Sequence, residues 1–151
     1  MHASKSGVAH FACDTEEDVI STIKELISYI PQNNREEPPF VPTNDPIDRK
    51  DDRLNEIIPD SPNEPYDMYE VINAIVDDGK FFEVQPNFAK NIIVGFARFN
   101  GQSVGIVANQ PKQLAGVLDC NSTRTLRQLD YFRIVYTLEN SSQFIWLIAD
   151  K

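Results

Sequence analysis

The stretch that decides the fold runs from Glu83 to Asp119 and reads EVQPNFAKNIIVGFARFNGQSVGIVANQPKQLAGVLD. It holds two apolar, β-rich runs, residues 92–99 and 103–108, on either side of Asn100-Gly101. Both residues of a tight two-residue turn must accept positive φ, which asparagine and glycine do readily. The pattern therefore predicts a β-hairpin.

The hairpin is expected to bury one apolar face. The residues expected on that face are Ile92, Val94, Phe96, Val104 and Ile106. Gly95 and Gly105 lie inside the strands, and a glycine at such a position suggests that another backbone approaches closely.

Further elements are expected on both sides of the hairpin. Phe81–Val84 and Leu114–Leu118 are predicted as short strands, and Phe144–Ala149 as a buried strand. Ser122 or Thr123 is expected to cap a helix that runs to about residue 138.

Two helices are predicted upstream. Asp14 or Thr15 caps the first helix and Pro31 ends it. Its apolar residues recur at three- and four-residue spacing and form one face: Val19, Ile20, Ile23, Leu26, Ile27 and Ile30. The second helix covers Tyr66–Asp78 and stops at Gly79, which suits a left-handed position.

The segment Pro31–Pro65 has a different character, since it holds eight of the ten prolines. Proline fixes φ and removes a backbone donor, so neither a helix nor a central strand persists there, apart from a short helical turn at Leu54–Ile58. A connector of this length is uncommon inside one compact domain and suggests a boundary between two units. The later alternation of strands and a helix indicates the α/β class.

Charge and composition exclude several function classes. Asp14–Asp78 holds 18 acidic and 5 basic residues, which would repel a nucleic-acid backbone. Gly79–Asp119 holds 4 basic and 2 acidic residues, so a cofactor that carries phosphates would prefer this half. No apolar run reaches the length of about 20 residues that spans a bilayer. With two isolated cysteines and no signal peptide, a cytoplasmic location is expected, or the mitochondrial matrix in a eukaryote.

Common catalytic motifs are missing from the sequence. It contains no GxSxG, HExxH, GxGxxG or GxxxxGK[ST] pattern. Its acidic pairs are adjacent in sequence, and adjacent side chains diverge on a helix, which argues against acid–base work by such a pair. No catalytic residue and no metal site is therefore predicted.

The quoted stretch resembles, nearly position for position, the carboxyltransferase (beta) subunits of biotin-dependent acyl-CoA carboxylases. The closest resemblance is to propionyl-CoA carboxylase beta chains and methylmalonyl-CoA decarboxylase alpha chains. The matching motifs are KSGVAH at 5–10, Asp45-Pro46, Asp48-Arg49, DDG at 77–79, FFE at 81–83, FAKNIIVGFAR at 88–98, Asn100-Gly101, GIVANQP at 105–111 and AGVLD at 115–119.

The resemblance implies a partial crotonase-like (ClpP/crotonase) α/β fold in a truncated fragment. Residues 1–31 would end the acyl-CoA-side domain, and residues 32–65 would form the proline-rich linker. Residues 66–122 would begin the biotin-side domain, and residues 123–151 would form a diverged or unrelated tail.

The implied reaction moves a carboxyl group from carboxybiotin to the carbon α to the thioester of an acyl-CoA such as propionyl-CoA. Biotin would arrive on a carrier or biotin carboxylase subunit and would not be bound directly, and other carboxyltransferase subunits would be further partners. Because the family's glycine-rich oxyanion turns have no match here, the chain alone is expected to be inactive. The alternative is a non-catalytic remnant or binding module that associates with full-length carboxyltransferase subunits.

The resemblance also suggests residues that line the substrate site. In crotonase-like folds an Ala-Gly loop often supplies an oxyanion-hole amide, although Gly116 could equally be required for packing alone. Lys90 and Arg98 are expected to be surface or interface charges. The predicted substrate-binding residues are Lys5, Ser6, Gly7, Asn109, Gln110, Ala115 and Gly116.

Overall fold

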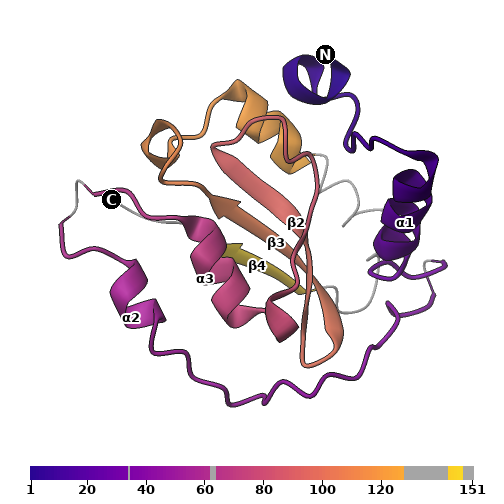
Figure 1. Cartoon of the computed structure of the whole chain (residues 1–151), viewed down its shortest axis with the longest axis horizontal. Coiled ribbons are helices and arrows are strands. Elements are labelled where there is room, and N and C mark those ends of the chain that lie inside the picture. The colour runs from indigo at the N-terminus through magenta and orange to yellow at the C-terminus, as the bar shows by residue number, and fades with distance from the viewer. Residues whose placement is uncertain (34, 62–63, 128–142, 148–151) are drawn as a thin grey trace.

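The computed structural model describes residues 1–33, 35–61, 64–127 and 143–147. At its centre lies a four-stranded sheet with strand order β1-β2-β3-β4 (Figure 1). The strands are β1 (Phe82–Glu83), β2 (Ile92–Phe99), β3 (Gln102–Asn109) and β4 (Gln143–Leu147). The first three strands are antiparallel, and β4 runs parallel to β3, which requires a crossover connection.

The predicted hairpin is confirmed. Asn100 and Gly101 form its two-residue turn with φ of 50° and 78°, and Phe99 pairs directly with Gln102. The predicted close approach is also confirmed at Gly95, because a Cβ there would meet the carbonyl oxygen of Phe82 on the neighbouring strand.

The expectation that five hairpin residues share one face is wrong. The turn sets a register in which Ala97 lies opposite Val104, and Val94 lies opposite Val107. Directly opposite residues share a face, and successive residues alternate between faces. Ile92, Val94 and Phe96 therefore face one side, while Val104 and Ile106 face the other, and all five are buried.

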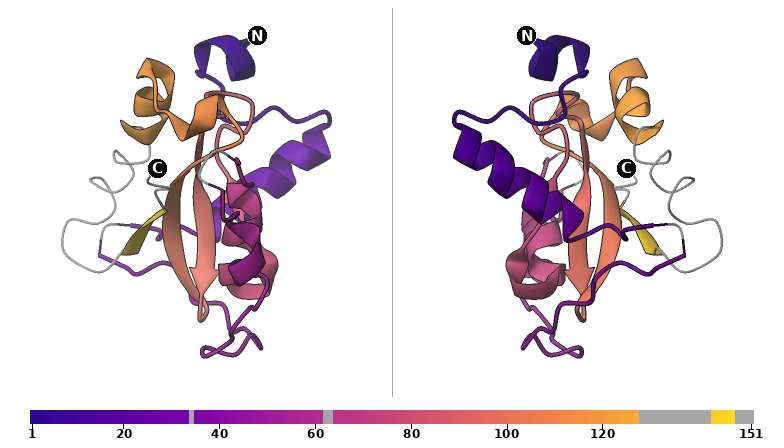
Figure 2. Two further views of the ribbon diagram at one scale, coloured as in Figure 1. Left: turned by 90° about the vertical axis from the view of Figure 1, so that its left-hand side faces the viewer. Right: turned by 90° about the vertical axis from the view of Figure 1, so that its right-hand side faces the viewer.

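Each face of the hairpin has its own apolar cluster. Helix α3 (Met68–Ile75) covers one face and lies beside the hairpin when the sheet is seen edge-on (Figure 2). The buried members of this cluster are Met68, Ile72, Val76, Ile93, Ala97, Val104, Ile106 and Ala108. The opposite cluster unites Tyr29, Phe82, Ile92, Val94, Phe96 and Val107.

Capping residues determine where the helices begin. Thr15 caps α1 (Glu16–Ile27), since its hydroxyl accepts from the N–H of Asp18 at 3.1 Å. Of the apolar face of α1, Leu26 packs against the second cluster, whereas Val19, Ile20, Ile23 and Ile27 are each about half exposed. The short helix α2 (Leu54–Ile57) lies where a helical turn was expected.

The helix that begins at residue 120 starts one turn earlier than expected. The carboxylate of Asp119 accepts from the N–H of Ser122 at 2.9 Å, so Asp119 is the cap and not Ser122 or Thr123. Helical structure is seen over residues 120–127, and the predicted end of this helix lies outside the described residues.

The segment before the connector packs on the sheet that follows it. Gln85 donates from Nε2 to the carbonyl of Gly7 at 2.6 Å and from its backbone N–H to His10 at 3.2 Å. The ring of Tyr29 stacks on Phe82 and Phe96, with centroids 5.8 and 6.0 Å away. Residues far apart in the sequence thus contribute to one core.

The connector runs around the outside of the molecule (Figure 1) and is fastened at three points. The N–H of Val41 donates to Gly101 O, and the carboxylate of Asp45 accepts from the N–H of Asp78, both at 3.1 Å. Arg49 donates to the carbonyl of Val76 at 3.1 Å. Among the helices of the described residues, none is long and apolar enough to cross a membrane.

We expect Gly95→Ala to destabilise the fold by about 1–3 kcal/mol, the usual range for overpacking. The added Cβ would collide with the Phe82 carbonyl and would lie 2.6 Å from the Phe81 ring. Urea unfolding followed by circular dichroism measures this change. Gln102→Ala, an exposed change on the same hairpin, should stay within about 0.5 kcal/mol of the unchanged chain. Equal stability of the two variants would contradict the close packing of β1 on β2.

A second prediction concerns the pair that links α3 to β1. The Tyr69 hydroxyl donates to Glu83 Oε1 at 2.7 Å, and burial raises the pKa of Glu83 above its ordinary value of 4.5, although the Tyr69 hydrogen bond and nearby Lys90 oppose the shift. Folding therefore favours the protonated acid. The stability it contributes is complete below about pH 4.5 and is lost as the pH rises through the higher folded pKa.

Glu83→Gln keeps the acceptor and cannot ionise, so it should remove this loss. Relative to the unchanged chain, the variant should gain free energy of unfolding between pH 4 and pH 7. Chemical unfolding at both pH values measures the gain, and a pH-independent difference would refute the shift.

Candidate functional site

Shortly after β3 ends at Asn109, the chain makes a left-handed turn at Leu114–Gly116. These three consecutive residues have φ of 50°, 53° and 76°, and the N–H groups of Gly116 and Val117 close the turn on Gln113 and Leu114. The expected strand at Leu114–Leu118 is therefore wrong, because left-handed residues in a row reverse the chain and cannot extend it.

Two of the predicted site residues, Asn109 and Gln110, are buried and hold this region together. Gln110 Oε1 accepts from the N–H of Met68 at 3.2 Å, and its Nε2 donates to Asp67 at 2.8 Å. Asn109 Nδ2 donates to the carbonyl of Gly116 at 3.3 Å. These side chains fasten the turn and the start of α3, which is a positioning role.

Asn91 is a third buried amide at the turn, and sequence reasoning did not single it out. Its Nδ2 donates to the carbonyl of Val117 at 2.8 Å and lies 3.3 Å from Ser122 Oγ and 3.5 Å from Asp119 Oδ1. It thereby joins the exit of the turn to the cap of the next helix. The available signal was an amide directly before the apolar run that opens β2.

Within the turn, Ala115 and Gly116 differ in accessibility. Gly116 is buried, its N–H is bonded to Gln113 O, and a Cβ there would lie 2.6 Å from Asn109 Nδ2. Packing and backbone conformation both require this glycine. Ala115 is exposed, and within the described residues no hydrogen bond occupies its N–H. The amide open to a ligand is therefore that of Ala115.

The N-terminal helical turn, His2–Ser6, lies at the same end of the sheet as the left-handed turn (Figures 1 and 2), and Gly7 follows it in the chain. Lys5 is exposed, and Ser6 donates from Oγ to His2 O at 3.2 Å. Gly7 is buried with φ of 64°, and a Cβ there would lie 2.7 Å from the Phe88 ring. In the part of the chain that the structure describes, no hydrogen bond joins these residues to the turn.

The charges at this end belong to the same framework. Burial alone would raise the pKa of Asp67, but hydrogen bonds from Gln110 Nε2, the Tyr69 N–H and Lys112 together hold it below its usual 3.8. The N–H and hydroxyl of Ser122 lower the pKa of Asp119, which is the exposed helix cap. Both carboxylates are therefore ionised and engaged at neutral pH, which suits structural anchors better than proton-transfer groups.

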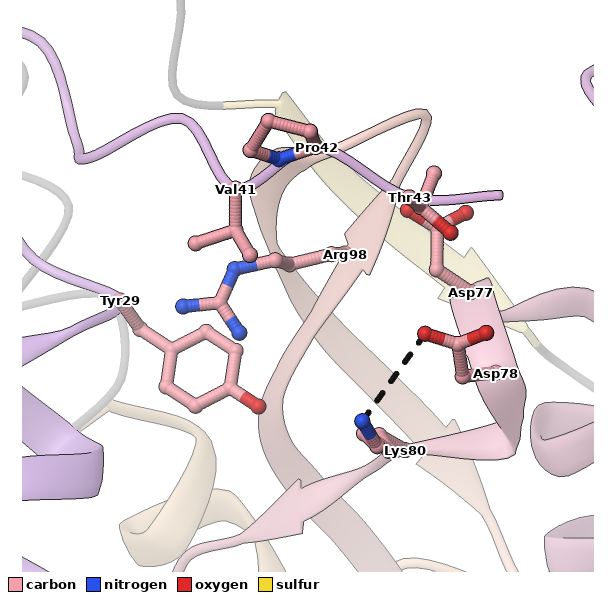
Figure 3. A pocket seen from close by; sticks show the side chains of 8 residues that line it. All are labelled: Tyr29, Val41, Pro42, Thr43, Asp77, Asp78, Lys80 and Arg98. Carbon is pink, nitrogen blue, oxygen red and sulfur yellow. Dashed lines mark ion pairs between the residues drawn. The ribbon is translucent and has the colours of Figure 1, made fainter. Parts of the chain in front are cut away.

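A separate small cavity lies at the hairpin-turn end of the sheet (Figure 3). It encloses about 50 Å³, far too little for a coenzyme A thioester. Its lining residues are Tyr29, Val41, Pro42, Thr43, Asp77, Asp78, Lys80 and Arg98. Elsewhere in the described residues, no group of three or more His, Cys, Asp or Glu side chains could hold a metal ion.

Comparison with known proteins finds that the chain is similar to subunits of acyl-CoA carboxylases and decarboxylases. It is 53% identical over 137 residues to the propionyl-CoA carboxylase carboxyltransferase subunit of Haloferax mediterranei and to the methylmalonyl-CoA decarboxylase alpha subunit of Veillonella parvula. Each alignment covers 88% of this chain and 27% of the relative. The mitochondrial propionyl-CoA carboxylase beta chain of Sus scrofa is 45% identical over 137 residues, which is 88% of this chain and 25% of that protein.

The fold is likewise similar to a solved structure. The crystal structure of transcarboxylase 12S, described as a hexamer with methylmalonyl-coenzyme A bound, has a TM-score of 0.86 and 33% identity. That likeness covers 99% of this chain and 29% of the other, and it confirms the expected crotonase-like class. The chain thus spans about a quarter of the length of its relatives. The family model for the carboxyl transferase domain matches residues 1–134, and the chain therefore belongs to that family.

Proposed function

We propose that this chain serves the transfer of a carboxyl group from carboxybiotin to the α carbon of an acyl-CoA of the propionyl-CoA type. The observation that carries the proposal is the open Ala115 amide, on a turn held by the buried side-chain amides of Asn91 and Asn109, in a chain of the carboxyl transferase family. Biotin arrives on a carrier protein or biotin carboxylase subunit, and further carboxyltransferase subunits complete the enzyme.

The chemistry explains why such an amide matters. In the transfer, the N–C bond of carboxybiotin and one C–H bond at the α carbon break, and a new C–C bond forms at the α carbon. The α proton passes to the biotin nitrogen that has lost the carboxyl group, and negative charge gathers on the ureido oxygen while the N–C bond breaks. A fixed backbone N–H directed at a developing oxyanion stabilises it without reorganisation at the moment of reaction. The Ala115 N–H is fixed in this manner, because Asn109 and Asn91 hold the carbonyls of Gly116 and Val117.

Each of the proposed domains is assigned its own part of the substrate site. Residues 1–31 form the end of the acyl-CoA-side domain, and residues 32–65 form the linker. Residues 66–122 form the beginning of the biotin-side domain, and residues 123–151 form the tail. Lys5, Ser6 and Gly7 then contribute to the acyl-CoA surface, and Ala115 contributes to the biotin surface. The shared end of the sheet supports this assignment (Figures 1 and 2), since both groups must face one reaction centre.

A second candidate function is a non-catalytic module that binds full-length carboxyltransferase subunits. The specific observation in its favour is the apolar face of α1, where Val19, Ile20, Ile23 and Ile27 keep 43%, 53%, 49% and 54% of their surface exposed. Exposed apolar rows of this kind mark interaction surfaces.

The chain by itself is expected to be inactive, because one turn amide does not make a complete site for both substrates. Purified chain, incubated with carboxybiotin and propionyl-CoA, should form no methylmalonyl-CoA above the uncatalysed background. A full-length propionyl-CoA carboxylase beta chain assayed alongside is the positive control. Turnover by this chain would refute the inactivity, and capture of the full-length subunit without turnover would favour the binding module.

The role of Asn91 gives a prediction with a pH dependence. In Asn91→Asp, burial and the neighbouring carboxylate of Asp119 should raise the pKa of the introduced acid above the unfolded value of about 3.9. Below that value the protonated acid can still donate to Val117 O. As the pH rises through the folded pKa, this bond is lost and an unpaired charge is buried, at a cost of about 3 kcal/mol.

Urea unfolding at pH 4 and pH 7.5 measures the effect, and the amide resonance of Ala115 reports on the turn itself. The matched control is Asn55→Asp on the exposed surface of α2, which should change stability by less than about 0.5 kcal/mol at either pH. If Asn91→Asp destabilises the chain equally at both pH values, the amide does not hold the turn by donation.

A further inference from the structure

The cavity at the hairpin-turn end lies away from the left-handed turn and is not used by the proposed carboxyl transfer. Four parts of the chain enclose it: the end of α1 with Tyr29, the connector at Val41–Thr43, the bend Asp77–Lys80, and Arg98 on β2 (Figure 3). Such a junction of segments is a common place for a small ligand.

Arg98 is the unusual group in its wall. Its guanidinium lies 4.1 Å above the Tyr29 ring, and Nη2 donates to the carbonyl and hydroxyl oxygens of Ser28 at 2.8 and 2.9 Å. Its Nε is buried and has no hydrogen-bond partner. Across residues 1–33, 35–61, 64–127 and 143–147, no carboxylate lies within 4.0 Å of it. Within that part of the chain the partly buried cation has no counter-ion, and a negative ligand in the cavity would supply one.

The carboxylates in the same wall are already engaged. Both oxygens of Asp77 accept from the hairpin turn, from the N–H of Asn100 at 2.9 Å and of Gly101 at 2.7 Å. Asp78 pairs with Lys80 only at 3.9 Å, and their side chains are 53% and 76% exposed. Because this pair is long and solvent-exposed, an anion in the cavity can compete with Asp78 for the Lys80 ammonium.

We propose that this cavity binds a small free carboxylate, which Lys80 and the Arg98 guanidinium hold from two sides. Its volume of about 50 Å³ matches three or four water-sized groups, at about 10–15 Å³ each, and so fits formate or acetate. Since the four charged side chains of the wall sum to zero, the expected affinity is weak, with Kd in the millimolar range. The site is independent of the proposed carboxyl transfer.

The test is a titration of the ¹⁵N-labelled full chain with formate and with acetate, at ionic strength held constant with chloride. Saturable shifts of the Tyr29, Lys80 and Arg98 amides support the site. Butyrate, which exceeds the volume, should bind at least tenfold more weakly. Shifts that do not saturate, that chloride reproduces, or that butyrate produces with equal affinity would overturn the proposal, since each indicates a general ionic effect on an open surface.

Two variants locate the binding. Arg98→Met keeps an unbranched chain over Tyr29 but removes the charge, and it should weaken acetate binding at least tenfold. Lys80→Met, at an exposed position that folding tolerates, should weaken it severalfold and serves if the first variant fails to fold. Lys50→Met, at an exposed cation outside the lining of the cavity, should leave Kd unchanged. Unchanged affinity in a folded Arg98→Met chain, or in Lys80→Met, would refute the assignment.

Discussion

The rest of the structure depends on the two-residue turn at Asn100-Gly101. It fixes the register of β2 against β3, and a slip of one residue would exchange the two buried faces. The carboxylate of Asp77 accepts from both N–H groups of this turn, and Val41 bonds the carbonyl of Gly101. The turn thus also anchors the end of α3 and the connector.

The two ends of the sheet differ in the polar and charged side chains that gather there. At the end where β3 stops, neutral amides of Asn91, Asn109 and Gln110 satisfy buried backbone groups and carry no net charge. Because these amides carry no net charge, they can hold a backbone N–H toward an oxyanion without repelling the oxyanion. At the hairpin-turn end, Asp77, Asp78, Lys80 and Arg98 line a small cavity, and among the described residues no carboxylate lies within 4.0 Å of the Arg98 guanidinium.

The contacts between distant segments of the chain agree with its similarity to longer proteins. It covers about a quarter of their length, yet its fold matches that of a much longer chain with a TM-score of 0.86. Contacts between distant segments support that likeness: Gly7 with Gln85, Ser28 with Arg98, and Tyr29 with Phe82 and Phe96. The proline-rich connector spans these segments while the packing of their side chains holds them together.

Local rules in the sequence were sufficient for the hairpin, a first helix capped at Asp14 or Thr15, the second helix and the family. Each depends on residues close together in the chain or on a motif such as FAKNIIVGFAR. The strand expected at Leu114–Leu118 failed because left-handed φ at Leu114 and Ala115 is imposed by amides elsewhere, not by local preference.

The face assignment of Val104 and Ile106 required the pairing across strands, which alternation within a single strand does not define. The hydrogen-bond partners of Asn91 and Arg98 likewise lie 26 to 70 positions away in the sequence. The sequence by itself determined the hairpin, the two upstream helices and the family that the chain resembles. Only the tertiary structure decided which polar groups find partners, because burial and hydrogen bonding there are set by long-range packing.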